Sequence, residues 1–212
     1  MSIDTWLAFA AASAVLLVIP GPTILTVISY SVAHGRAANV PLVAAVALGD
    51  STALFLSLAG LGGLLATSAI LFQLVKWAGG LYLIYLGIKL MRSGTDDLPV
   101  TAAPATVSRG RLFANTYAVT ALNPKGIIFF VAFLPQFIRP GADVTRQLWT
   151  LALTFVTLAT LNAALYAVFA ASARRFLSRA RARRAFNGVG GSLLFGAGVW
   201  ALLARRTVQA GS

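Results

Sequence analysis

Long apolar stretches separated by short polar connections are the main pattern in this chain of 212 residues. A membrane-spanning helix needs about 20 predominantly apolar residues, and several stretches reach that length. We expect them at residues 6–30, 39–60, 68–91, 112–134, 148–171 and 187–204. The pattern predicts an all-α, polytopic membrane protein: a single integral membrane domain with six transmembrane helices.

The amino-acid composition agrees with this interpretation and argues against a soluble domain. Apolar residues make up 58% of the chain and charged residues 10%, whereas soluble domains contain roughly 25% charged residues. The net charge of +12 would suit a nucleic-acid-binding surface, but the basic residues flank the apolar stretches and do not cover one face. We therefore expect membrane lipid, and no nucleic acid, as a partner.

Residues that most catalytic and metal-dependent chemistry requires are missing from the sequence. The chain has no Cys and no Glu, and its single histidine, His34, falls in the short polar stretch after the first apolar one. A His-rich metal site or a cysteine nucleophile is therefore excluded. We expect no catalytic residue, no metal site, no cofactor and no enzyme activity.

The basic residues orient the expected helices. The connections after the first, third and fifth stretches contain eleven of the 17 Lys and Arg residues, and the opposite side contains five. Because cytoplasmic connections are enriched in basic residues, both termini are expected outside. A five-helix count would invert the N-terminus. The basic tract 174–184 resembles a helix lying on an anionic cytoplasmic leaflet.

Two features recur in both halves of the chain. A glycine pair followed by a third glycine repeats with an offset of 111 residues, at Gly79, Gly80 and Gly87 and at Gly190, Gly191 and Gly198. Proline interrupts the first and fourth stretches, at Pro20-Gly21-Pro22 and at Asn123-Pro124. We therefore expect two three-helix repeats, 1–92 and 111–212, joined by a cytoplasmic loop at 93–110. An odd number of helices inverts the second repeat, as in many secondary transporters.

The proline breaks are the candidates for substrate binding. Proline removes a backbone donor, and broken helices within a bilayer occur where they face protein or a water-filled cavity. The N-H groups that start the second half of each helix would attract a carboxylate. The residues assigned to this site are Pro20, Gly21, Pro22, Thr23, Asn123, Pro124 and Lys125. The alternative is that both breaks are packing kinks.

Asp50 is the acid expected inside the membrane, near the middle of the second helix. Such residues commonly mark a substrate pathway or a proton relay. Asp50 is therefore the expected proton-coupling residue, alternating between a proton and a substrate ammonium. The alternative is a static ion pair with Lys125 that holds the two halves together. Lys125 could equally clamp a substrate carboxylate, and the sequence leaves both roles open. The repeated glycines are expected to allow close helix packing.

Four segments in this order resemble the LysE/RhtB family of amino-acid exporters, and the resemblance covers essentially the whole chain. The segments are Pro20-Gly21-Pro22, Gly49-Asp50, Lys76 to Gly87, and Asn123-Pro124-Lys125 continuing to Phe137. The resemblance carries Gly49 over as a further family position, which we assign to helix packing. Thr23 stands where many members have Asn, which leaves the substrate open.

The resemblance implies a bacterial inner-membrane exporter of amino acids or close derivatives, driven by proton antiport with alternating access. Its partners would be the amino-acid substrate, protons and lipid, with a second copy of the chain, in a homodimer, as a further candidate. The alternatives are an exporter of a different small solute, such as a cation or drug, a passive channel, and a membrane scaffold that transports nothing. A scaffold would have no use for broken helices or a central acid.

Overall fold

The computed structural model describes residues 1–67, 69–92, 107–139, 142–170, 172 and 179–203, and these residues form helices without any strand. The predicted all-α class is therefore confirmed for the described part of the chain. The α-helices are α1 (Ile3–Val18), α2 (Pro22–His34), α3 (Asn39–Thr67), α4 (Ala69–Arg92), α5 (Arg109–Ala121), α6 (Pro124–Ile128), α7 (Val144–Val168) and α9 (Ala180–Leu203). Three short segments are not α-helical: the 3-10 turns η1 (Gly35–Ala38) and η3 (Leu134–Phe137), and the π-helical η2 (Phe129–Phe133).

Three helical runs among the described residues are long and apolar enough to cross a membrane. They are Pro22–Gly60, Arg109–Phe137 and Val144–Val168, and the shorter segments Ile3–Val18 and Gly80–Lys89 are also apolar. The first run contains the turn at Gly35, whose φ of 66° is the one positive value in the described chain. That conformation suits glycine because it has no Cβ, and it ends α2 before α3 begins.

The first and fourth predicted helices are both interrupted where proline occurs. α1 ends at Val18 and α2 starts at Pro22, and α5 ends at Ala121 before α6 starts at Pro124. Proline at the first helical position suits a helix start, because its missing N-H would have no partner there. Beyond α6 the predicted fourth helix, 112–134, continues as η2 and η3.

Three predicted boundaries need correction. α5 begins at Arg109, where the Ser108 hydroxyl accepts the N-H of Arg111 as an N-cap, so the loop expected at 93–110 ends earlier. α3 extends to Thr67. α9 begins at Ala180, so the end of the basic tract 174–184 belongs to this helix and not to a separate surface helix. Residues 174–178 of that tract lie outside the described residues.

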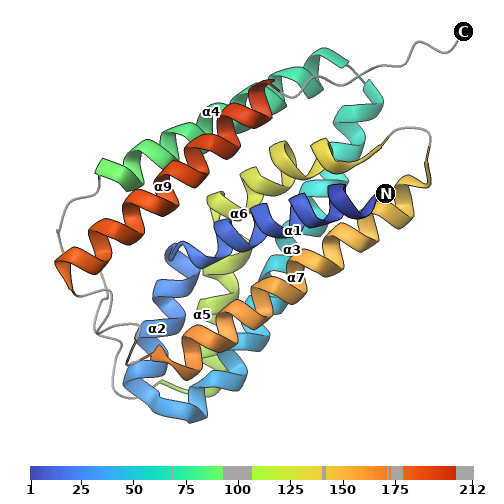
Figure 1. Cartoon of the computed structure of the whole chain (residues 1–212). Coiled ribbons are helices and arrows are strands. Elements are labelled where there is room, and N and C mark those ends of the chain that lie inside the picture. The colour runs from blue at the N-terminus through green and yellow to red at the C-terminus, as the bar shows by residue number, and fades with distance from the viewer. Residues whose placement is uncertain (68, 93–106, 140–141, 171, 173–178, 204–212) are drawn as a thin grey trace, which may run out of the picture.

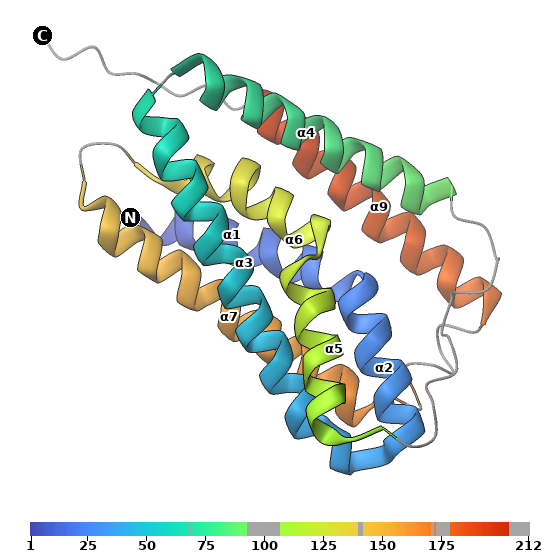
Figure 2. The ribbon, with the colours of Figure 1, turned by 180° about the vertical axis from the view of Figure 1, so that it is seen from behind.

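The helices form two groups, which Figures 1 and 2 show from opposite sides. α4 and α9 lie side by side along one side of the molecule and pack mainly on each other. The other helices form a bundle in which α3 packs on α5 and α7, and α1 packs on α7. The two helix breaks meet in the middle of this bundle.

Two different sets of apolar side chains fill the bundle on either side of the breaks. On the side of α1, η2 and η3 the core is aromatic, and its rings include Phe9, Phe129, Phe130, Phe133, Phe137 and Phe155. On the side of α2 and the start of α3 the core is aliphatic, with Val27, Ala38, Leu42, Val46, Leu112, Ala163 and Ala167. The polar residues of the candidate site therefore lie between two apolar layers.

Candidate functional site

At the end of α1, two backbone carbonyl groups lack their usual N-H donors, because proline stands at the positions that would supply them. In an α-helix the carbonyl of residue i accepts the N-H of residue i+4. For Leu16 and Val18 those partners would be Pro20 and Pro22, which have no N-H. An unpaired carbonyl in a membrane interior costs several kcal/mol, so other donors must replace the missing ones.

Lys125, from the other broken helix, donates to one of these two carbonyls and also to the neighbouring carbonyl of Ile19. Its Nζ donates to the carbonyl oxygens of Leu16 at 2.9 Å and Ile19 at 2.8 Å. The helix dipole gives this end of α1 a partial negative charge, which an ammonium group complements. Gly21 lies beside this ammonium group, since a Cβ at that position would be in ordinary contact with Nζ, at 3.4 Å.

Two side chains of α7 bind the remaining carbonyls at the end of α1. Asn162 Nδ2 donates to the Leu17 carbonyl at 3.0 Å, and the Tyr166 hydroxyl donates to the Val18 carbonyl at 2.8 Å. Sequence analysis missed both residues. A signal was present, because a polar residue and a tyrosine at i and i+4 share one face of an otherwise apolar helix.

The second break is joined to the first by Asn123. Its Oδ1 accepts the N-H of Lys125 at 3.1 Å and so caps α6, while its Nδ2 donates to Thr23 Oγ1 at 3.2 Å. At the start of α2, by contrast, Gly21 offers no side-chain cap. The predicted residues Gly21, Thr23, Asn123 and Lys125 therefore come together at one place.

Asp50 faces the same place from α3 and is 7% exposed. A Cβ added to Gly126, in the first turn of α6, would lie 4.0 Å from Asp50 Oδ1. Asp50 and Lys125 interact electrostatically. Within the described part of the chain, however, the Lys125 ammonium is hydrogen-bonded to α1 carbonyls and does not form a direct ion pair with Asp50. A static pair of these two charges is therefore not what the structure contains.

A small cavity separates these groups. Its volume is about 30 Å³, and its lining includes Gly21, Thr23, Asp50, Asn123, Lys125 and Asn162. A water molecule occupies about 30 Å³ in the liquid, so the cavity has room for roughly one water and none for an amino acid. The other three predicted site residues do not line it: Pro20 is half-buried, and Pro22 and Pro124 are exposed.

The glycines assigned to helix packing lie at close helix contacts wherever the structure describes them. A Cβ at Gly49 would come within 2.7 Å of Thr120 Cβ on α5. Gly80 lies against Gly198 and Gly87 against Gly191, so α4 and α9 meet through facing glycines in antiparallel register. The surroundings of Gly79 and Gly190 lie outside the described residues.

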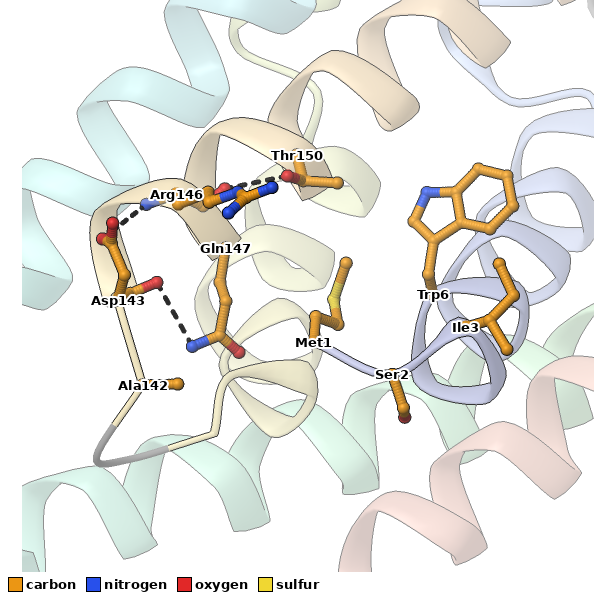
Figure 3. A pocket seen from close by; sticks show the side chains of 9 residues that line it. All are labelled: Met1, Ser2, Ile3, Trp6, Ala142, Asp143, Arg146, Gln147 and Thr150. Carbon is orange, nitrogen blue, oxygen red and sulfur yellow. Dashed lines mark hydrogen bonds between the residues drawn. The ribbon is translucent and has the colours of Figure 1, made fainter.

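A larger cavity, of about 680 Å³, lies at the end of the bundle where α1 and α7 begin. Figure 3 shows Trp6 on α1 facing Arg146 and Gln147 on α7 across this space. Two of its polar side chains have partners elsewhere: Trp6 Nε1 donates to Thr154 Oγ1, and Gln147 donates to the Arg139 carbonyl. We place the candidate site at the small cavity instead, because the buried charges and the freed helix ends meet there.

Among the described residues no group of three or more His, Cys, Asp or Glu side chains comes together. The site therefore consists of one acid, one ammonium group, amides, hydroxyls and backbone carbonyls. Such a set can hold a small zwitterion or an organic ammonium ion.

Comparison with known proteins assigns the chain to a family. The sequence profile of the LysE type translocators matches residues 14–205. A homoserine/homoserine lactone efflux protein of Salmonella typhimurium is 34% identical over 194 residues, which are 91% of this chain and 93% of that protein. A leucine efflux protein of Salmonella choleraesuis is 33% identical over 130 residues, 61% of each chain.

A third relative, from Vibrio cholerae, is named as an uncharacterized membrane protein and is 31% identical over 201 residues, 94% of this chain and 97% of that protein. No solved structure gives a significant match. The family match covers both helix breaks, Asp50 and Lys125. The chain belongs to the LysE family of translocators, and the two Salmonella relatives are named as efflux proteins, not enzymes.

Proposed function

We propose that the protein exports amino acids or close derivatives from the cytoplasm across a bacterial inner membrane. The observation that carries this proposal is the 34% identity to a homoserine/homoserine lactone efflux protein over nine-tenths of both chains. The buried Asp50 and the half-buried Lys125 beside two broken helices supply polar groups of the kind that such a substrate needs. A scaffold that transports nothing would have no reason to bury an acid in an apolar bundle.

The proposed architecture is six transmembrane helices in two inverted repeats. The first repeat comprises 1–92, the second extends from the start of α5 at Arg109 to residue 212, and the connection between them is a cytoplasmic loop, with both termini outside. The positions of the two breaks support this arrangement, because each lies in the first helix of its repeat. The facing glycines of α4 and α9, the third helix of each repeat, support it as well.

Alternating access is the proposed mechanism, with proton antiport through Asp50. A cavity of about 30 Å³ cannot hold an amino acid, so the two repeats must separate on one side at a time to admit and release one. Asp50 is the proton-coupling group in this scheme because it is buried between the helices that would separate. Its carboxyl group would take up a proton from outside as substrate leaves.

The compounds in the names of the relatives share one chemical group. Homoserine and its lactone share an α-ammonium group, but the lactone has no free carboxylate. Leucine shares the α-ammonium and not the side-chain hydroxyl. We propose that this chain likewise requires the ammonium group and tolerates loss of the carboxylate.

Counterflow in proteoliposomes tests the function. Vesicles containing the protein are loaded with unlabelled solute and assayed for uptake of labelled homoserine, homoserine lactone or leucine, with a cationic drug and a metal cation for comparison. We expect exchange of at least one amino acid and no exchange of the drug or metal. Exchange confined to the drug or metal would contradict amino-acid export.

The role of Asp50 is tested in the same vesicles with Asp50→Asn, and Asp4→Asn is the matched control because Asp4 is exposed at the start of α1. We expect Asp50→Asn to abolish substrate movement driven by a pH gradient, and Asp4→Asn to behave as the wild type. Full gradient-driven export by Asp50→Asn would remove Asp50 from the mechanism.

A further inference from the structure

The carbonyl groups at the end of α1 already hold an ammonium ion, that of Lys125. We propose that the Leu16 and Ile19 carbonyls form the subsite for the substrate ammonium, and that Lys125 occupies it until substrate displaces the lysine. This inference rests on the proposed function and deepens it by naming the groups that recognise the substrate. It assigns the substrate ammonium to backbone carbonyls and not to the Asp50 carboxylate.

The chemistry of the subsite favours a primary ammonium. Two carbonyl oxygens at 2.8 and 2.9 Å from Lys125 Nζ show that the spacing fits an ammonium group donating two hydrogen bonds. An α-ammonium has the same three N-H donors as a lysine ammonium. Leu16 and Ile19 are both buried, so these carbonyls require a donor at all times and would accept an exchange of one ammonium for another.

Lys125 is a suitable temporary occupant. It reaches the carbonyls through a flexible four-carbon stem, and this stem passes beside Gly21, which has no side chain to pack against it. Lys125 lines the cavity, so its withdrawal both frees the carbonyls and enlarges the space. Asp50 lines the same cavity and is the acid toward which the displaced ammonium can turn.

The other two carbonyls at the end of α1 are held differently. Leu17 and Val18 bind Asn162 and Tyr166, neutral side chains of a helix that has no break. A neutral amide and a phenol do not resemble the substrate ammonium. We therefore restrict the subsite to the two carbonyls that hold Lys125, and assign Asn162 and Tyr166 to positioning the end of α1.

A comparison of ligands on the wild-type protein is the first test. Binding of homoserine lactone, its N,N,N-trimethyl analogue and 4-hydroxybutyrate is measured by equilibrium dialysis in detergent at about pH 6, where an α-amino group is protonated. The trimethyl analogue keeps the charge but has no N-H to donate. We expect it to bind about tenfold more weakly than the lactone or worse, and 4-hydroxybutyrate, which lacks the ammonium, not to bind.

A variant supplies the second test. Lys125→Met keeps the length of the side chain and removes the competing ammonium, so the lactone should bind about tenfold more tightly than to the wild type. Lys89→Met is the matched control, because Lys89 lies at the end of α4 and does not line the cavity. We expect its affinity for the lactone to be unchanged.

The results distinguish the subsite from its alternatives. If Lys125 instead binds the substrate carboxylate, Lys125→Met will weaken the binding of homoserine and leave the affinity for the lactone unchanged. If the wild type binds the lactone and its trimethyl analogue equally well, the proposed subsite is wrong but the proposed function is not. This test needs no variant, so it holds even if Lys125→Met fails to fold. If none of homoserine, its lactone and leucine binds the wild type, the proposed function itself is contradicted, and the subsite with it.

Discussion

The α4–α9 pair and the two helix breaks are both places where helices approach one another closely, and they do so by different means. In the pair formed by α4 and α9, glycine faces glycine, and a Cβ on Gly87 would lie 2.6 Å from the Gly191 carbonyl oxygen. At the two helix breaks the contact is made by side chains, with Lys125 reaching backbone carbonyls of the opposite broken helix. The first contact depends on shape and the second on hydrogen-bond donors and acceptors.

The difference follows from the state of the backbone. An intact helix has satisfied its own N-H and C=O groups, so in a membrane it associates mainly through close packing of small residues. A broken helix presents groups that need a partner, and a ligand can replace a side chain as that partner. The α4–α9 pair is therefore suited to stability, and the crossing of the breaks is suited to binding.

Gly87→Ala should give the largest loss of stability, because the added methyl would meet backbone atoms of α9 that cannot rotate away. We expect destabilisation by about 3 kcal/mol, measured as thermal unfolding in detergent, with substrate affinity unchanged in the folded fraction. The control is Gly196→Ala on α9, where a Cβ would have nothing within 4 Å. Equal stability of the two variants would show that the glycine contact between α4 and α9 is not tight.

Gly49→Ala should have a somewhat smaller effect. The methyl would lie 2.7 Å from Thr120 Cβ and 3.1 Å from the Tyr117 carbonyl oxygen, so α3 and α5 must move apart. We expect a loss of about 2 kcal/mol. Gly60→Ala is the control on the same helix, because its Cβ would have nothing within 4 Å, and it should stabilise the helix slightly. A stable Gly49→Ala would contradict the packing role of this glycine.

Asn162→Leu tests the region of the breaks. Loss of the amide leaves the Leu17 carbonyl without its donor, and we expect destabilisation by about 1–2 kcal/mol together with slower counterflow, because the end of α1 is no longer held. Tyr166→Phe removes the donor to Val18 in the same way. If both variants lose stability yet transport at the wild-type rate per folded molecule, positioning of α1 does not limit transport.

Gly21→Ala should change stability least. Its methyl would lie 3.4 Å from Lys125 Nζ, an ordinary contact, so we expect a change within about 0.5 kcal/mol. Transport should nevertheless slow, since the methyl narrows the space through which the Lys125 ammonium withdraws. Such a result would distinguish the roles of the two regions. A glycine substitution in the α4–α9 pair would lower stability, whereas Gly21→Ala would lower the transport rate. An unchanged rate would remove Gly21 from the transport pathway.

The sequence predicted the breaks well because proline has a direct effect on the backbone. Pro20, Pro22 and Pro124 mark the interruptions to within a few residues of where the helices stop and restart. The prediction that the fourth helix runs to 134 was less accurate, because the change to π and 3-10 geometry at Phe129 has no marker in an apolar run.

The partners of Lys125 could not be predicted from the sequence. Every residue has a backbone carbonyl, so a carbonyl that binds a side chain carries no signature, whereas the acid Asp50 is conspicuous. The expected choice for Lys125 was therefore between a substrate and Asp50, and the structure contains a third partner. The repeated glycines indicated close packing, but an offset within one chain does not reveal that the two sets face each other.

The small volume of the central cavity has a consequence for the membrane potential of the cell. The central cavity has room for about one water, and mostly apolar side chains pack on either side of it, so the described part of this conformation has no space at the site for a file of several waters along which protons could hop. A cell that produces it in quantity should therefore keep its membrane potential when no substrate is present. Under the proposed proton antiport, protons would cross only as fast as the protein turns over, one carrier cycle at a time.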